Sequence, residues 1–264
     1  MVRIFAFICL LLSANPALAQ GLFSMESTEG ARQWEAVGRL EIGGAAFCTG
    51  ALITERLVLT AAHCLYDAQS GAPVDVRDIQ FLAGWRNGRA AAYRRTKRAV
   101  AHPDYDYNDP SSTERVRHDL ALLELQHPVR NTTVVPFATG PLPARGAEVG
   151  VVSYAHDRSE APSLQDYCTV ISHQQGLLVL SCEVDFGASG SPVFTFGEDG
   201  SARIVSVVSA KAEAGGRKVS LAVNLDAPLA ELRAALRAAG DPGAGLDRMP
   251  AGNRRDTGAK FIRP

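Results

Sequence analysis

The sequence predicts an all-β protein, either a barrel or a sandwich, organised as two halves. Short apolar segments recur along the chain and are separated by turn-forming residues, a spacing typical of all-β folds. The Pro- and Gly-bearing stretch from Val135 to Gly146 divides the chain into two halves of about one hundred residues, a usual domain size. With 24 Gly and 14 Pro, and with 46% hydrophobic residues, the composition suits a turn-rich globular protein.

The first nineteen residues have the features of a secretory signal peptide. Arg3 supplies a positive charge, the apolar core from Ile4 to Leu12 is too short to span a bilayer, and residues 17–19 read Ala-Leu-Ala. A retained membrane anchor is the alternative that this length disfavours. We expect segment 1–19 to be removed, leaving a secreted or periplasmic chain that begins near Gln20 and has no further contact with a membrane.

The segments expected to be strands combine apolar or β-branched side chains with flanking turn residues. They are 36–42, 50–53, 56–60, 79–84, 120–125, 148–154, 165–171, 176–182, 192–196, 204–210 and 219–224.

A single helix is predicted after the last strand, over residues 227–240. Its leucines recur at helical spacing at positions 229, 232 and 236, Asp226 precedes it as a possible N-cap, and Gly240 stands where a C-terminal cap belongs. The segment 241–264 is rich in Gly, Pro and charge without periodicity, so we expect a flexible tail.

Three residues far apart in the sequence suit nucleophilic catalysis. His63 ends an apolar strand, Asp119 stands before the apolar run Leu120–Leu125, and Ser189 lies in a glycine-rich turn. A serine hydroxyl needs a neutral imidazole to take its proton, and a carboxylate to set the tautomer of that imidazole. The chain order His, Asp, Ser is that of the chymotrypsin arrangement. The glycine that a lipase-type elbow needs two places after the serine is absent, because Ser191 stands there.

Four short segments, in the correct order, carry a resemblance to a known family: Cys48–Ile53, Thr60–Cys64, Asp119–Leu123 and Gly187–Val193. Over residues 34–224 the chain resembles the trypsin/chymotrypsin-like serine peptidases, and most of all their bacterial secreted members. The resemblance implies two antiparallel six-stranded β-barrels (chymotrypsin-like) with a C-terminal α-helix. It places His63 and Asp119 in a barrel at 33–136, Ser189 in a barrel at 145–226, and the active site between them.

The resemblance implies a secreted serine endopeptidase that acts on peptides or proteins through an acyl-enzyme intermediate. It needs no cofactor, and we expect a monomer. The net charge of −1 gives no reason to expect nucleic-acid binding. A non-catalytic binding module on the same scaffold is the alternative, since a fold does not determine a function.

Removal of the signal peptide would also remove Cys9 and leave four cysteines, which permit three pairings. The resemblance implies the bridge Cys48–Cys64, and the other two, Cys168 and Cys182, would then pair. No close cysteine pair has the spacing of a structural zinc site. We expect no metal, because the remaining histidines also lack paired ligand spacing and the acidic run 104–109 lacks the glycine and glutamate of a calcium loop.

The same resemblance implies roles around the nucleophile. Gly187 and Ser189 would supply the backbone N–H groups of the oxyanion hole. The substrate pocket would be lined by Glu183, Val208, Ser209 and Lys211. A buried Glu183 would favour Arg or Lys at the cleaved position, whereas the Lys211 ammonium could neutralise Glu183 or attract acidic side chains.

The clearest departure from the family is Ala188, which stands where most trypsin relatives carry an acidic residue directly before the nucleophile. In those relatives the carboxylate receives the N-terminal amine freed by zymogen cleavage. A methyl group cannot pair with that charge. We therefore expect signal-peptide removal to be sufficient for activity, with Asp185 as an alternative acceptor.

Overall fold

The computed structural model describes residues 22–25, 28–110 and 112–240. The expected signal peptide at 1–19 and the expected tail at 241–264 lie outside the described residues. Within the described part of the chain, no helix is long and apolar enough to cross a membrane.

The first half of the chain forms a closed, antiparallel six-stranded barrel. Going round the barrel, the strands are β2 (Val37–Ile42), β3 (Ala46–Leu52), β4 (Leu57–Thr60), β7 (Ala121–Leu125), β6 (Ala92–Ala101) and β5 (Ile79–Ala83). Inward side chains such as Leu40, Leu59, Phe81 and Leu123 are almost fully buried. Their burial provides the main driving force for closing the barrel.

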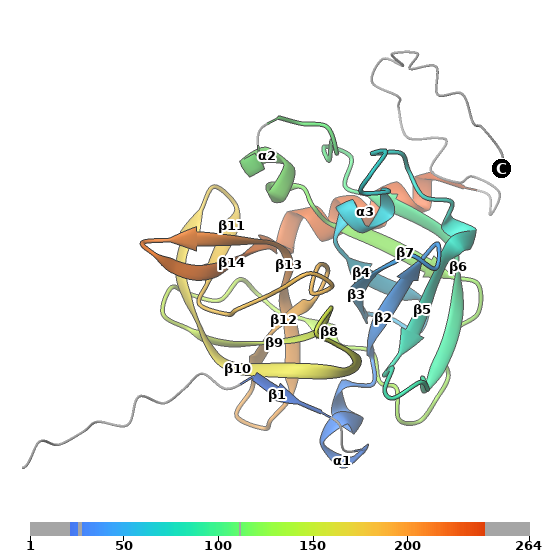
Figure 1. Cartoon of the computed structure of the whole chain (residues 1–264), viewed down its shortest axis with the longest axis horizontal. Helices are drawn as coiled ribbons and strands as arrows, with labels where there is room; N and C mark the ends of the chain where they lie inside the picture. The colour runs from blue at the N-terminus through green and yellow to red at the C-terminus, as the bar shows by residue number, and fades with distance from the viewer. Residues whose placement is uncertain (1–21, 26–27, 111, 241–264) are drawn as a thin grey trace, which may run out of the picture.

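The second half forms a second antiparallel ring of six strands, beside the first in Figure 1. Its order is β9 (Glu148–Ala155), β10 (Arg158–Gln174), β11 (Leu177–Leu180), β14 (Arg217–Asn224), β13 (Ala202–Ala214) and β12 (Pro192–Phe196), closed by pairing of β9 with both β12 and β10. Two short strands extend it: β1 (Leu22–Ser24) pairs with β10, and β8 (Ala138–Thr139) runs parallel to β13. The expected two-barrel, chymotrypsin-like fold is confirmed.

The expected C-terminal helix is present as α3 (Asp226–Ala238), which packs against β6 and β7 through its three buried leucines. Asp226 is not its N-cap, contrary to expectation: Leu225 holds that place, and the side-chain oxygen of Asn224 accepts a hydrogen bond from the Asp226 N–H instead. Gly240 follows the helix with φ +54°, the left-handed conformation that glycine adopts after a helix end.

The remaining helical segments are short. They are α1 (Thr28–Ala31), α2 (Ser112–Arg117) and the 3₁₀ turns η1 (Arg32–Trp34), η2 (Ala62–Leu65) and η3 (Val76–Asp78). Of these, η2 carries His63, and α2 ends two residues before Asp119.

One long strand, β6, is absent from the strands expected from sequence. Its buried positions carry the small side chains of Ala92, Thr96, Ala99 and Ala101, whereas positions between them carry Arg and Lys. A strand whose inward side chains are this small gives only a weak alternation of hydrophobicity. Its charged residues lie on the outer face, as expected for a solvated strand.

Candidate active site

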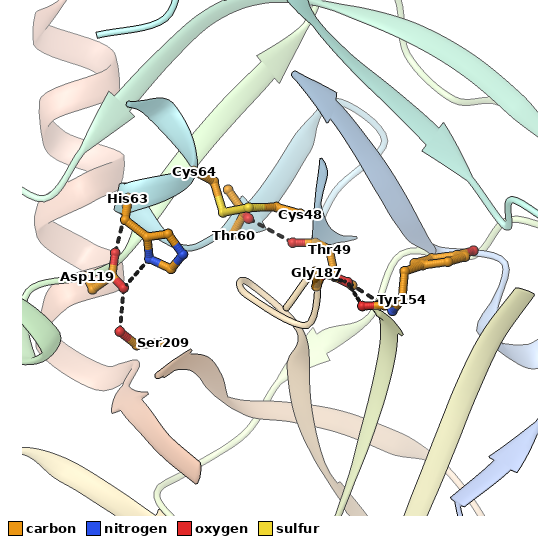
Figure 2. Close-up of a disulfide and its surroundings, with 9 residues drawn as sticks. All are labelled: Cys48, Thr49, Thr60, His63, Cys64, Asp119, Tyr154, Gly187 and Ser209. Carbon is orange, nitrogen blue, oxygen red and sulfur yellow. Dashed lines mark hydrogen bonds and ion pairs between the residues drawn. A yellow bond between two sulfur atoms is a disulfide. The ribbon is translucent and has the colours of Figure 1, made fainter. Parts of the chain in front are cut away.

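His63 is held at the edge of the first barrel by a covalent bond next to it. The disulfide Cys48–Cys64 joins β3 to η2, directly beside His63 (Figure 2). The second disulfide implied by the resemblance, Cys168–Cys182, is also present and ties β10 to the segment that leads to Ser189. A bridge that closes a loop of this size stabilises the fold by roughly 3 kcal/mol in the chain-entropy model.

Asp119 binds His63 through both of its carboxylate oxygens. Oδ1 accepts the His63 backbone N–H at 2.8 Å, and Oδ2 lies 2.6 Å from Nδ1 of the ring. The Ser209 hydroxyl, from β13 of the second barrel, donates a further hydrogen bond to Oδ2 (Figure 2). Asp119 is only 3% exposed, so these donors replace the water that an ionised carboxylate needs.

The pKa of His63 reflects two opposing effects. Burial disfavours the imidazolium, but the negative charge of Asp119 and the hydrogen bond to it favour the imidazolium more. The net effect raises the pKa of His63 above its ordinary value of 6.5. His63 is thereby suited to take up a proton and to hold it transiently.

Ser189 lies in a tight turn between two glycines that both have left-handed backbone conformations, Gly187 at φ +93° and Gly190 at φ +79°. A Cβ on Gly187 would lie 2.3 Å from the Phe47 ring, and one on Gly190 would lie 2.1 Å from the hydroxyl of Thr60. Both positions therefore require glycine. The turn presents Ser189 to a cavity of about 960 Å³ that His63 and Asp119 also line.

The backbone around Ser189 leaves two N–H donors available. The N–H groups of Ala188, Gly190 and Ser191 are bonded to backbone carbonyls, whereas those of Gly187 and Ser189 have no acceptor within the described residues. The carbonyl of Phe186 is held away by the His156 N–H at 2.8 Å. Two unused donors beside a nucleophile are what an oxyanion hole requires.

Thr49, whose role sequence reasoning missed, joins the nucleophile turn to the first barrel. Its hydroxyl donates to the Gly187 carbonyl at 2.9 Å and accepts from the Tyr154 N–H at 3.0 Å (Figure 2). Its backbone N–H donates to the Ser189 carbonyl at 2.8 Å. Thr49 lies next to Cys48 in the sequence, but no local pattern reveals a contact with residues so distant along the chain.

The expected pocket residues do not lie together. Glu183 is exposed, lines neither of the two cavities in the described part of the chain, and offers only its backbone N–H to Gln165. An unpaired carboxylate is far more stable in water than buried. Val208 is packed in the core of the second barrel. Only Ser209 lines the cavity with His63 and Ser189, and its hydroxyl is bonded to Asp119.

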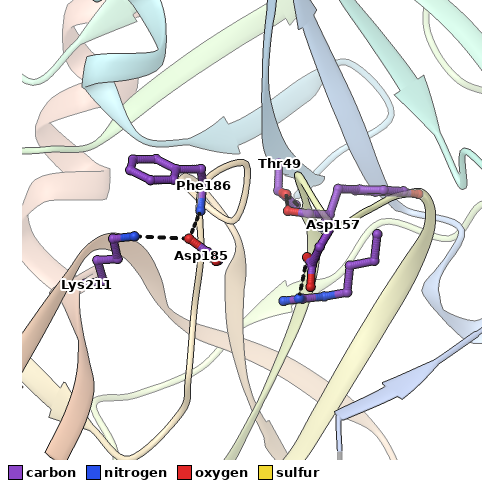
Figure 3. A network of polar contacts seen from close by, with 7 residues as sticks. Thr49, Asp157, Asp185, Phe186 and Lys211 are labelled. Carbon is purple, nitrogen blue, oxygen red and sulfur yellow. Dashed lines mark hydrogen bonds and ion pairs between the residues drawn. The ribbon is translucent and has the colours of Figure 1, made fainter.

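Lys211 pairs with Asp185 rather than with Glu183. Its ammonium lies 3.0 Å from the Asp185 carboxylate and 3.9 Å from the centre of the Phe186 ring (Figure 3). The positive charge and a hydrogen bond from the Phe186 N–H both lower the pKa of Asp185. Asp185 is about half exposed and already paired, so it is not the buried acceptor for an N-terminal amine that we had considered.

A second cavity of about 710 Å³ adjoins the first and shares Arg115, Val116 and Ala210 with it. Its described lining residues include two cations, Arg115 and Lys211, and no carboxylate. The first cavity contains carboxylates away from the triad as well, at Asp67, Asp75 and Asp78. The two parts of the cleft therefore differ in charge.

Comparison with known proteins agrees with this geometry. The family model described as "Trypsin" matches residues 24–227. Serine protease 56 of Mus musculus is 33% identical over 116 residues, which are 44% of this chain and 18% of that protein. Serine protease filzig of Drosophila melanogaster is 37% identical over 116 residues, 42% of this chain and 6% of that protein. The chain thus matches only a small part of the length of these animal proteins.

Among solved structures, the one titled "Structure of Glu endopeptidase in complex with MPD" superposes with a TM-score of 0.65 at 18% identity. The superposition covers 83% of this chain and 97% of that one. At this identity the likeness concerns the fold.

Proposed function

This chain belongs to the trypsin family, and from that membership we propose that it is a serine endopeptidase whose catalytic triad is His63, Asp119 and Ser189. One observation carries the proposal. His63 is bonded to Asp119 at 2.6 Å, and both line one cavity with Ser189.

The proposed reaction assigns a role to each of these groups. Ser189 Oγ attacks the peptide carbonyl and passes its proton to His63, while Asp119 holds the ring in the required tautomer. The N–H groups of Gly187 and Ser189 stabilise the oxyanion, a contribution of about 3 kcal/mol per donor. His63 then protonates the leaving amine, and water hydrolyses the acyl-enzyme by the same steps in reverse order.

Labelling with a fluorophosphonate tests the assignment directly. The wild-type chain should become labelled once per molecule at Ser189, and it should hydrolyse a peptide ester. Ser189→Ala should abolish both. Ser191→Ala is the matched control, because Ser191 is a fully buried serine in the same turn. Labelling that persists in Ser189→Ala would refute the proposal. Absence of labelling in a folded wild-type chain would favour the non-catalytic binding module.

We also propose that the enzyme is exported and acts outside the cytoplasm. Two disulfides suit an oxidising compartment, and the first nineteen residues have the composition of a signal peptide. The narrower assignment to bacterial secreted peptidases rests on the sequence motifs alone, since the relatives named above are animal proteins.

For the substrate, we propose a preference for acidic side chains on the N-terminal side of the cleaved bond. His63 delivers its proton to the leaving amine, so the residues after the cleaved bond lie on the side of His63 and Cys64. The residues before that bond then extend toward Ala210 and Lys211, where the described lining residues carry only positive charge. This replaces the preference for Arg or Lys, which depended on a buried Glu183.

A further inference from the structure

Two histidines distant in sequence meet behind the proposed triad. His102 directly follows β6, and His118 lies between α2 and β7, immediately before Asp119. Their rings are stacked, with centroids 5.1 Å apart. No sequence spacing reveals this pair, because the contact depends on the pairing of β6 with β7.

A carboxylate joins the two rings. Asp104, His102 and His118 each offer one ligand atom, and these atoms lie within 4.8 Å of one another. The backbone N–H of Asp104 donates to Nδ1 of His102 at 3.2 Å, which places Asp104 on the Nδ1 side of the ring. Two imidazoles and one carboxylate form a donor set that suits Zn²⁺, with a fourth position left for water.

A second carboxylate stands on the other side of His102. Oε2 of Glu231, on α3, lies 3.1 Å from Nε2 of His102. This contact falls short of hydrogen-bond geometry, and the buried Nε2 has no other partner in the described part of the chain. Metal-bound histidines commonly donate their second ring N–H to a carboxylate, which orients the ring and makes it a better ligand.

We propose that Asp104, His102 and His118 bind a divalent transition-metal ion such as Zn²⁺, with Glu231 orienting His102. Ligand atoms of a tetrahedral zinc ion lie roughly 3.3 Å apart, given bonds of about 2.0 to 2.1 Å. The present separation therefore has to close by at most about 1.5 Å. His118 is only partly buried and Asp104 is exposed, so both side chains can make this adjustment, whereas His102 is fixed in the interior.

The charges and the position of the cluster favour an ion that links separate elements. Two carboxylates offset the charge of a divalent cation, so its transfer to this site leaves no net charge. The ion would connect the end of β6 to the segment that carries Asp119. Because it binds the folded chain only, it should also raise the thermal unfolding temperature.

The test uses the full, untagged, metal-free chain. Zn²⁺ affinity is measured by competition with a chromophoric chelator, and Co²⁺ is added to record the visible absorption of a tetrahedral site. We expect one bound equivalent, a weakening of at least tenfold in His118→Asn and in Asp104→Asn, and a weakening of about tenfold to a hundredfold in Glu231→Gln.

His173→Asn is the matched control, since His173 is exposed on β10, outside the cluster. It should bind Zn²⁺ like the wild type. Asp104→Asn is a surface change, so it keeps the test decisive if His118→Asn fails to fold. No binding by the wild type, or equal affinities in the wild type and Asp104→Asn, would overturn the proposal. So would a loss in His173→Asn equal to that in Asp104→Asn.

Discussion

At the scale of single residues, the pair formed by His63 and Asp119 sets how the proposed chemistry responds to pH. The carboxylate holds the imidazole by two bonds, and its charge raises the pKa of His63 despite burial. The same carboxylate is held by Ser209 from the other barrel. Two predictions follow from these contacts.

The first concerns pH. A general base must be neutral, so kcat/KM should rise with pH, and because the pKa of His63 is raised, the midpoint should lie above 6.5. Asp119→Asn removes the charge that raises this pKa, so the midpoint should fall, while the rate drops about 10⁴-fold from loss of the correct tautomer. Rate profiles measured from pH 5 to about pH 9 check this. An unchanged midpoint in a folded Asp119→Asn chain would contradict the role given to Asp119.

The second concerns Ser209. Ser209→Ala removes a hydrogen bond to a buried charged group, an interaction worth about 1.5 to 3 kcal/mol, so kcat/KM should fall roughly tenfold to a hundredfold. Ser206→Ala is the control, because Ser206 lies on the same strand and donates to the Val223 carbonyl, away from the site. Steady-state kinetics of the two variants provide the comparison. Equal losses in both would mean that Ser209 acts on stability alone.

At the scale of elements, the nucleophile turn depends on a strand of the other barrel. Thr49, on β3, is fully buried and binds the carbonyls of Gly187 and Ser189. The turn itself has few regular backbone bonds, so these contacts help to keep the N–H groups of the proposed oxyanion hole in position. The cleft between the barrels is thus linked by hydrogen bonds as well as by packing.

Replacement of Thr49 tests this link. Thr49→Val keeps the shape but leaves the Gly187 carbonyl and the Tyr154 N–H without a partner, at about 1 to 3 kcal/mol for each buried group. We expect lower stability in urea and a lower kcat with little change in KM. Thr49→Ser keeps the hydroxyl and should retain most of the activity. If valine and serine variants had equal kcat, the hydroxyl would have no part in positioning the turn.

At the scale of the whole molecule, the cleft has a distribution of charge and the chain has an unusual start. The charge difference follows from residues of both barrels, with Arg115 and Lys211 at one end and Asp67, Asp75 and Asp78 at the other. The first described strand, β1, pairs with β10 at Ser163–Gln165, and Ala188 is fully buried without a charge to offer.

The charge distribution predicts which peptides are cleaved faster. Peptides with Glu just before the cleaved bond should have a kcat/KM roughly fivefold higher than those with Lys, since exposed ion pairs contribute about 0.2 to 1 kcal/mol. Lys211→Glu should reverse the order, and added salt should weaken both effects. Lys218→Glu, on the neighbouring strand and exposed, serves as control. Equal turnover of both peptides by the wild type would refute the preference.

The start of the chain predicts activity without a terminus-triggered switch. Ala188 cannot pair with a new N-terminal amine, and Asp185 is already bound to Lys211. Chains with one to three extra residues before Gln20 should therefore hydrolyse a peptide ester at rates within about twofold of the chain that begins at Gln20. Activity that appears only after these residues are removed would show that a switch exists.

Much of the fold follows from local patterns in the sequence. Apolar spacing located most strands and the helix α3, because burial of one face requires that spacing wherever the strand lies. The exceptions have physical causes: β6 buries small side chains, and the cap of α3 is provided by Asn224 rather than Asp226. The segments that carry His63, Asp119 and Ser189 are recognisable for the same reason, since each needs a particular local turn or strand end.

Taken alone, the sequence determined the fold class, the two disulfide pairs implied by the resemblance, and the residues proposed for catalysis. The tertiary structure decided which side chains meet. It brought Ser209 to Asp119, Thr49 to the nucleophile turn, Lys211 to Asp185, and His102 to His118, and it left Glu183 in solvent. Each of these contacts joins residues far apart in the chain, and it forms only once strand register and barrel closure have set the distance between them.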